Sequence, residues 1–361
     1  MRTQFFSLRI WSLFLASVLL FTACDNSDDD NPSTPDPSGK YSEGFFVVNE
    51  GNFSDGDGTI GFVDNSGTLV SNTIYEDENG FALGGIIQNM RIYEGKAYIM
   101  TNNVDKVTVV DPADFTEETF VEGMEDPFDF AAIGNKGYIS VWGETPDFVN
   151  YPDGRIAVMD LETNEITNSI QIGARAAGVL AHQGKIYVAL EGGVEVLVID
   201  PTTDAITTRI VTPFGPSKFV VSNDNNVWVL CAGGALVQIN SSSDAVVNTI
   251  EGLSVLGYNE KVAYNPDNNT IYWLSSGFDP VTFAPINTVV YALSADATEA
   301  PASPFLELDY NPYGIGFNGG ELYVGSADFV SEQNPVYVYN TNGELLRTFT
   351  GGRGPNGFVF Q

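Results

Sequence analysis

The fold is decided by residues 185–224, which read KIYVALEGGVEVLVIDPTTDAITTRIVTPFGPSKFVVSND. This stretch contains an aromatic strand, a polar turn, a second apolar strand that ends in Asp, an amphipathic third strand and, after a proline, a fourth. Short apolar runs bounded by Gly, Pro, Asn and Asp are typical of β-strands. No segment of the chain has a sustained apolar period of 3.6 residues, so we expect very little helix.

The same phrase recurs along the chain. Its aromatic strand occurs seven times, around Phe46, Tyr98, Tyr138, Tyr187, Trp228, Tyr272 and Tyr323. From Tyr98 onward these strands are 40, 49, 41, 44 and 51 residues apart. Four short strands repeated at this period are the pattern of a β-propeller blade. We therefore expect an all-β, seven-bladed propeller over residues 44–361, with four antiparallel strands per blade, named A to D from hub to rim.

The two ends of the repeat region predict how the ring closes. The first copy, GFFVVNEG from residue 44, begins at a B strand and lacks its own A strand. The last strand phrase, PNGFVF at residues 355–360, matches the A-strand phrases at residues 127–130 and 312–317. The C-terminal strand should therefore be strand A of the first blade, which leaves no open sheet edge.

The first 23 residues have the pattern of a secretory signal peptide. Arg2 and Arg9 precede an apolar run, residues 10–21, that is short for a membrane span, and small residues follow it. The string LFTAC resembles a bacterial lipobox, which would make Cys24 the lipid-modified first residue of the mature protein. The alternative is a signal peptide followed by an incidental cysteine.

Residues 24–43 then form an acidic, extended tether. The run SDDD at residues 27–30 resembles the export signal that sends lipoproteins of the Bacteroidetes to the outer face of the outer membrane. The other interpretation of this run is a soluble spacer.

The chain is strongly acidic, with 15 Lys+Arg against 47 Asp+Glu and a formal net charge of -32. Such a surface repels phosphate backbones and anionic headgroups, so we expect no nucleic acid partner and membrane contact only through the lipid anchor. One His and two Cys leave no zinc site, catalytic triad or internal disulfide in the mature chain, and we expect no metal, cofactor or catalytic residues. Cys231, in the apolar string VWVLCAGG, is expected to be buried.

Many of the acidic residues have a structural explanation. An Asx residue begins the turn after the second strand of several repeats, at Asp111, Asp160, Asp200 and Asn240. Such side chains accept hydrogen bonds from backbone N–H groups two residues on. Asp55 and Asp57, in SDGDGTIG, suggest either a calcium loop or a glycine-rich turn; Phe53 breaks the EF-hand pattern and favours the turn.

One end of the propeller is expected to bind the ligand. The B–C turns and the D–A links lie on this end, and three B–C turns are long: residues 142–154, 275–287 and 326–335. Uneven insertions on one face mark the binding face of a repeat protein. We expect the opening of the central channel on this face, called the mouth, to be lined by Asn49, Glu50, Asn52, Trp142, Tyr151, Arg175, Phe214, Tyr258, Phe278, Tyr310, Tyr313 and Arg353.

Aromatic planes with a few polar groups suit a broad, flat, amphipathic ligand such as a corrin or a glycan. Some of these aromatic residues are instead expected to pack the loops against the rim. Arg353, in GGRGP, either meets a phosphate or carboxylamide of the ligand or pairs with one of the many acids.

The repeat pattern resembles the YncE-like seven-bladed propellers over residues 44–361. The start, EGFFVVNEGNF followed by GTIGFVD, resembles more narrowly a family of Bacteroidetes surface lipoproteins with this fold. The best understood branch of that family binds cobalamin and related corrinoids outside the cell and passes them to a TonB-dependent outer-membrane transporter. The resemblance implies a surface-exposed outer-membrane receptor, not an enzyme, with a corrinoid as the leading ligand and such a transporter as its partner.

Other functions stay open. The ligand of a receptor is alternatively a glycan or a siderophore. The same fold also serves enzymes, such as lactonases, lyases and quinoprotein dehydrogenases, and adhesive envelope proteins. The scarcity of His and of cationic residues to hold an anionic quinone argues against a quinoprotein.

Overall fold

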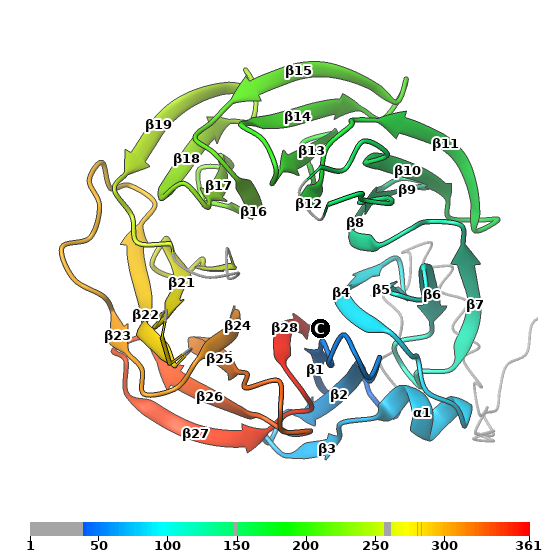
Figure 1. Cartoon of the computed structure of the whole chain (residues 1–361), viewed down its shortest axis with the longest axis horizontal. Coiled ribbons are helices and arrows are strands. Elements are labelled where there is room, and N and C mark those ends of the chain that lie inside the picture. Colours follow the sequence, from blue (N-terminus) through cyan, green and yellow to red (C-terminus); the bar gives the residue numbers. More distant parts are fainter. Residues whose placement is uncertain (1–38, 148–149, 256–260, 280, 283) are drawn as a thin grey trace, which may run out of the picture. The chain divides into compact units, whose positions relative to one another are not determined.

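The computed structural model describes residues 39–147, 150–255, 261–279, 281–282 and 284–361. The expected signal peptide, Cys24 and most of the expected tether lie outside these residues. The chain divides into two units, Met1–Asp36 and Pro37–Gln361, and only the second is described. In that unit, seven four-stranded antiparallel sheets form the blades of a ring (Figure 1), as the sequence predicted.

Each blade contains one A strand at the hub and a B strand paired with it. From blade 1 to blade 7, the A strands are β28 (Pro355–Phe360), β4 (Ile86–Tyr93), β8 (Pro127–Ile133), β12 (Ala176–His182), β16 (Pro216–Val221), β20 (Val262–Asn265) and β24 (Pro312–Asn318). The B strands are β1 (Gly44–Asn49), β5 (Lys96–Asn102), β9 (Lys136–Val141), β13 (Lys185–Leu190), β17 (Val227–Cys231), β21 (Thr270–Phe278) and β25 (Glu321–Ser326).

The outer strands follow in the same order. The C strands are β2 (Thr59–Asp64), β6 (Lys106–Val110), β10 (Arg155–Asp160), β14 (Glu195–Asp200), β18 (Ala235–Asn240), β22 (Pro285–Ser294) and β26 (Pro335–Asn340). The D strands are β3 (Leu69–Ser71), β7 (Glu117–Glu122), β11 (Glu165–Gln171), β15 (Ala205–Val211), β19 (Ala245–Glu251), β23 (Leu306–Glu307) and β27 (Leu345–Thr350).

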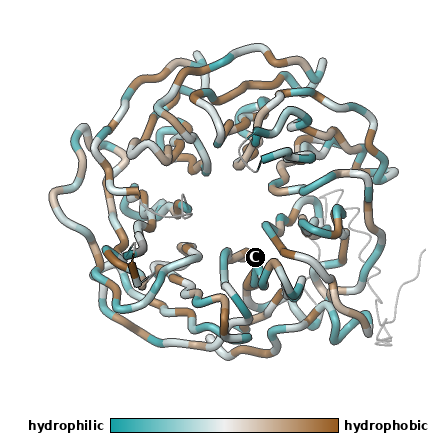
Figure 2. The backbone as a smooth tube through the Cα atoms, in the orientation of Figure 1, coloured by the Kyte–Doolittle hydropathy of each residue, from teal (hydrophilic) through white to brown (hydrophobic). Residues whose placement is uncertain are grey.

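The hydropathy of each strand matches its place in the blade (Figure 2). The B and C strands are nearly continuous apolar runs that are buried along their length, because neighbouring blades cover both of their faces. The D strands alternate between exposed and half-buried residues, since only one face meets the core. Aromatic residues fill the space between blades; for example, Tyr98 of blade 2 stacks on Phe130 of blade 3 at 4.4 Å between ring centroids.

A repeated polar contact also joins neighbouring blades. Lys136 and Tyr138, at the start of β9, both donate to Asp204 in the C–D turn of the next blade, at 2.9 and 2.7 Å. Lys185 and Tyr187 of β13 donate in the same way to Asp244, at 2.7 and 2.9 Å. The Lys-x-Tyr pattern therefore attaches each of these B strands to the following blade.

The ring closes as predicted, through β28 in the first blade. This strand pairs antiparallel with β1, and the register places Phe360 opposite Phe45 and Phe358 opposite Val47. Phe45 also packs against Tyr323 of the last blade, at 5.0 Å between ring centroids. The closing strand thus contributes both backbone pairing and aromatic packing.

The predicted turns are confirmed. The Asx side chains accept backbone N–H bonds at 2.8 to 3.0 Å in four C–D turns: Asp111 from Ala113, Asp160 from Glu162, Asp200 from Thr202 and Asn240 from Ser243. The single helix among the described residues is α1 (Ile74–Asn79), in the link between blades 1 and 2. Cys231 is fully buried, as predicted.

Two segments differ from expectation. The long B–C turn predicted at residues 275–287 is mostly strand, because β21 and β22 extend into it, with a register shift between Ser275 and Gly277. Tyr41 was assigned to the tether, yet its side chain is buried and packs on Phe62 and Phe115. Tyr41 therefore belongs to the packed part of the chain, although it precedes β1.

No helix in the described part of the chain has the length and apolar character needed to cross a membrane.

Candidate functional site

A cavity of about 790 Å³ opens on the face that carries the B–C turns and the D–A links. Six residues expected at the mouth line it: Glu50, Asn52, Trp142, Tyr151, Arg175 and Tyr313. They come from blades 1, 3, 4 and 7, so the fold brings together residues from distant parts of the sequence. This volume falls within the range of small-molecule sites.

One wall of the mouth is an aromatic layer capped by a guanidinium. Trp142 stacks on Phe128 at 4.4 Å and meets the edge of Tyr151 at 5.9 Å. The Arg175 guanidinium lies over both Trp142 and Tyr151, at 4.8 and 5.4 Å from their ring centroids. Trp142 Nε1 donates to the carbonyl of Ala176 at 2.7 Å, which fixes the orientation of the indole. The layer is therefore preorganised.

Glu191 holds the same guanidinium in place. The guanidinium donates to Oε1 of Glu191 at 2.7 Å. Burial raises the pKa of Glu191, and the charges of Arg175 and Lys218 offset only part of this effect. Glu191 is thus a partly desolvated carboxylate at the edge of the mouth.

The opposite wall offers hydrogen-bonding groups. The Tyr313 hydroxyl donates to Oε2 of Glu50 at 2.5 Å, and Nδ2 of Asn356 donates to the same oxygen at 3.0 Å. Burial and the neighbouring Glu50 raise the pKa of Tyr313 well above its usual value, so Tyr313 stays protonated. The Lys261 ammonium lies 4.1 Å from the centroid of the Tyr313 ring.

The mouth also contains residues that the sequence analysis missed. Four of the A strands place the residue after their first proline in the cavity: Phe128, Ser217, Tyr313 and Asn356. Only Tyr313 was expected there. Aligning the A-strand phrases on their prolines would have found the other three. No comparable signal marks Lys218 and Lys261, which also line the cavity.

Four expected residues lie elsewhere. Asn49 is fully buried, bonded to Thr59 and to the Gly352 N–H, because it faces away from the mouth while the next residue, Glu50, faces into it. Tyr310 packs between blades, stacked on Tyr337 at 4.0 Å. These two placements at the mouth were wrong.

Arg353 and Phe214 are also outside the lining of the mouth. Arg353 pairs with Asp55 at 2.6 Å and with Asp57 at 3.3 Å, so of its two predicted roles the structure has the pairing with acids. These contacts also explain SDGDG as a turn anchored by Arg353.

Among the described residues no cluster of three or more His, Cys, Asp or Glu side chains is placed to hold a metal. Phe214 is exposed on the D–A link.

The remaining expected residues are not described. Tyr258 and Cys24 lie outside the described residues. Phe278 ends β21, but its side chain is not among those described.

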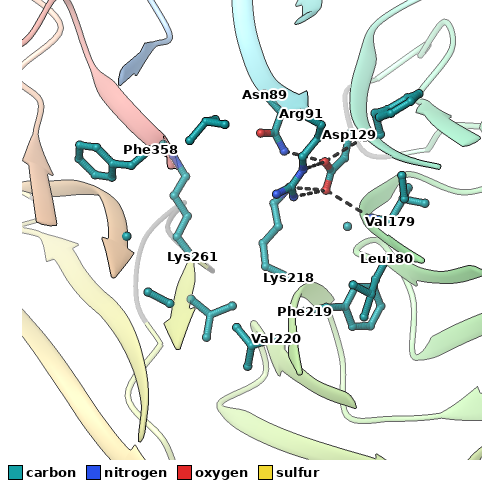
Figure 3. Close-up of a pocket in the computed structure, with 18 of the residues that line it drawn as sticks. Asn89, Arg91, Asp129, Val179, Leu180, Lys218, Phe219, Val220, Lys261 and Phe358 are labelled. Carbon is teal, nitrogen blue, oxygen red and sulfur yellow. Dashed lines mark hydrogen bonds and ion pairs between the residues drawn. The ribbon is translucent and has the colours of Figure 1, made fainter. Parts of the chain in front are cut away.

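Below the mouth the channel continues as a second cavity of about 500 Å³ (Figure 3). The two cavities adjoin, because four residues line both: Gln88, Lys218, Lys261 and Asn356. At this level the carboxylate of Asp129 is fully buried. Burial alone would raise the pKa of Asp129, but the charges of Arg91 and Lys218 outweigh it and the pKa is lowered.

Comparisons with known proteins agree with this architecture. A family model described as a domain of unknown function, DUF5074, matches residues 43–350. The comparison with curated proteins finds no match.

Solved structures with the same fold share little sequence with the chain. A quinonprotein alcohol dehydrogenase-like protein from Bacteroides thetaiotaomicron is 19% identical, with a TM-score of 0.68 over 89% of this chain and 78% of its own. Dihydro-heme d1 dehydrogenase NirN in complex with DHE is 14% identical, with a TM-score of 0.55 over 88% and 75%. BamB from Moraxella catarrhalis is 12% identical, with a TM-score of 0.56 over 88% and 86%. At these identities the likeness concerns the fold alone.

Proposed function

The chain belongs to the DUF5074 family, and from the geometry of its mouth we propose that it is a receptor for a small nutrient ligand, with a corrinoid such as cobalamin as the leading candidate. In this proposal the protein is a lipoprotein anchored through Cys24 on the outer surface of the outer membrane. It captures the ligand and passes it to a TonB-dependent transporter.

One observation carries the proposal: the mouth has an aromatic wall facing a hydrogen-bonding wall. Phe128, Trp142 and Tyr151 form a contiguous aromatic layer in the lining, in which Tyr151 is buried and Arg175 lies over Trp142 and Tyr151. On the facing wall Glu50 and Asn356 line the cavity, and the side-chain amides of Gln88, Asn102 and Asn103 line it from blade 2. A corrin is a broad macrocycle whose edge carries amide groups, so it matches both walls.

The rim of the mouth supports transfer to a partner. Large apolar side chains are strongly exposed on the B–C turns around it, with exposed fractions of 71% for Phe53, 82% for Val281 and 85% for Val330. Exposed apolar residues grouped on one face are a feature of interaction surfaces. In this proposal they contact the transporter while the ligand occupies the mouth.

The test is to titrate the purified protein with cobalamin, following the corrin absorption spectrum and the heat of binding. Alanine at Trp142 or Tyr313 should weaken binding by about tenfold or more, because each removes an aromatic contact from a desolvated site. Phe120→Ala is the matched control, since Phe120 is an exposed aromatic residue on a D strand. The assignment would be rejected if the wild type does not bind cobalamin. It would also be rejected if the Trp142 and Tyr313 variants bind cobalamin as tightly as the wild type does.

A propeller enzyme is the rival function. The described residues that line the mouth include no His or Cys, so acid–base chemistry there would depend on carboxylates such as Glu50 and Glu191 or on the Tyr and Lys side chains of the lining. The scarcity of cations argued against a quinoprotein, but Arg91, Lys218 and Lys261 gather in the channel, which weakens that argument. A dye-linked alcohol oxidation assay with added pyrroloquinoline quinone separates the two functions: turnover would favour the enzyme.

A further inference from the structure

The central channel carries an excess of positive charge. The lower cavity is lined by Arg91, Lys218 and Lys261, and by a single carboxylate, Asp129, among the described residues. Within the lower cavity three cations and one anion leave a formal charge of about +2, whereas the whole chain has a formal net charge of -32 with only 15 Lys+Arg. The mouth above, which Lys218 and Lys261 also line, adds Arg175 and the carboxylates of Glu50, Asp126 and Glu191, so the excess of positive charge is confined to the lower cavity. A concentration of cations at the centre of an acidic protein calls for an explanation.

Asp129 uses only part of the bonding capacity of Arg91 and Lys218. It accepts from Arg91 Nε at 3.2 Å and Nη2 at 3.4 Å, and from Lys218 Nζ at 3.1 Å (Figure 3). A guanidinium has five N–H donors and an ammonium has three. Arg91 is also accessible, with 47% of its side chain exposed, whereas Asp129 is 1% exposed. Arg91 therefore presents N–H donors to the channel, whereas the acceptor oxygens of Asp129 are buried.

Lys261 completes the cationic group from the other side of the channel. Its ammonium donates to the carbonyl of Asn356 at 3.0 Å and lies against the Tyr313 ring. Figure 3 draws Lys261 and Lys218 on facing walls, with Arg91 beside Asp129. A small ligand at this level would meet positive charge from β4, from β16 and from the residue before β20.

The walls below the cations are apolar. Val179, Leu180, Phe219, Val220 and Phe358 surround the lower cavity (Figure 3). Low-dielectric walls strengthen electrostatic attraction inside a channel. The acids of the outer surface act weakly here, because at physiological salt charges more than about 8 Å apart through solvent are largely screened.

We propose that Arg91, Lys218 and Lys261 form an oxyanion-binding subsite that takes a phosphate group at the base of the mouth. The planar guanidinium of Arg91 and the compact ammonium groups of Lys218 and Lys261 are donors that suit the oxygens of a phosphate. The phosphate is either free inorganic phosphate or a phosphodiester carried by a ligand in the mouth. Only the second source rests on the proposed function, since cobalamin carries a phosphodiester and cobinamide lacks one.

The first experiment titrates the full chain with inorganic phosphate, measured by calorimetry and by ³¹P NMR. The variants are Lys218→Met and Lys261→Met, each of which removes one cation and keeps the aliphatic length. Lys96→Met is the matched control: it also removes one positive charge, but its ammonium pairs with Glu118. We expect each channel variant to weaken phosphate binding about tenfold, and Lys96→Met to leave it unchanged.

The melting temperature of each variant shows whether the channel stays folded. If Lys218→Met lowers it, Lys261→Met provides the measurement, because the Lys261 ammonium donates to Asn356 whereas that of Lys218 donates to the buried Asp129. A wild-type protein that binds no phosphate, or channel variants that bind it as the wild type does, would overturn the subsite.

The second experiment compares cobalamin with cobinamide. If the phosphodiester occupies the subsite, Lys218→Met weakens cobalamin binding and leaves cobinamide binding unchanged. If both corrinoids bind equally to wild type and variant while phosphate binding is lost, the subsite takes free phosphate. If phosphate binds in the expected pattern and neither corrinoid binds, the subsite stands and the proposed receptor function fails.

Discussion

Lys218 Nζ lies 3.1 Å from Oδ2 of Asp129, although 89 residues separate them in sequence. Asp129 belongs to blade 3 and Lys218 to blade 5. The same carboxylate accepts from Asn89 and Arg91 of blade 2 and from the Val179 N–H of blade 4. One buried side chain therefore joins four consecutive blades at the wall of the channel.

Replacing Asp129 should destabilise the protein strongly. In Asp129→Asn the cations of Arg91 and Lys218 lose their buried counterion, so we expect the free energy of unfolding to fall by about 3 kcal/mol. Urea unfolding followed by fluorescence measures this change. Glu122→Gln, an exposed position on β7, is the control and should change stability by less than about 0.5 kcal/mol. Equal midpoints for the two variants would contradict the role of Asp129.

The contribution of Asp129 should depend on pH. Because its pKa is lowered in the folded protein, the stabilising effect is fully present above the unfolded pKa and is lost as pH falls through the folded pKa. The stability difference between wild type and Asp129→Asn should therefore be constant from pH 7 to about pH 5 and shrink below about pH 4. A difference that shrinks instead between pH 7 and pH 5 would mean that the pKa is raised.

Deleting residues 354–361 should prevent normal closure of the ring. The deletion removes β28, and with it the pairing to β1 and the contacts of Phe358 and Phe360 with Phe45. We expect the melting temperature to fall by about 10 °C or more, if the chain folds at all. Deleting Gln361 alone is the control: it removes one exposed residue after the strand and its hydrogen bond to the Tyr41 carbonyl, and keeps β28. An unchanged melting temperature in the longer deletion would argue against closure by this strand.

Arg353 should order a loop rather than bind the ligand. In Arg353→Met, Asp55 and Asp57 lose their cation, so residues 52–57 should exchange amide hydrogens faster. Cobalamin affinity should change less than in Trp142→Ala. Arg209→Met, which breaks an exposed pair with Glu195, is the matched control for loss of one arginine. If Arg353→Met loses as much cobalamin affinity as Trp142→Ala and amide hydrogen exchange does not change, Arg353 binds the ligand instead.

Cys231 should be inert in the folded protein. Burial raises the pKa of its thiol to about 12, so almost no thiolate is present at pH 8. In a Cys24→Ser variant, a thiol reagent should modify Cys231 at least about 100-fold more slowly in native protein than in urea. Fast modification of the native protein would show that the region opens.

The repeating part of the fold could be predicted from the sequence because each blade has the same local pattern. An aromatic B strand and a C strand that ends in an Asx turn are visible without any tertiary information, and Tyr187 and Asp200 illustrate them. The missing first A strand and the extra last one also predicted the pairing of β28 with β1.

The site was harder to predict because it depends on which way each side chain points. Neighbouring residues of a strand face opposite sides, so Glu50 reaches the mouth and Asn49 does not. Tyr310 and Tyr313 are close neighbours in the sequence, yet one packs between blades and the other lines the cavity. Lys218 and Lys261 meet only when the ring is closed, and nothing local in the sequence marks that meeting.

Because β28 pairs with β1, the first blade is packed like the others although its strands come from the two ends of the ring-forming chain. Phe360 lies opposite Phe45, so a short linker between these two strands would make the first blade continuous. A circularly permuted chain that begins at another blade's C–D turn should then fold to the same ring and keep its channel. In such a permutant the residues that precede β1 could be joined to a different blade, so the mouth would have another orientation relative to that segment.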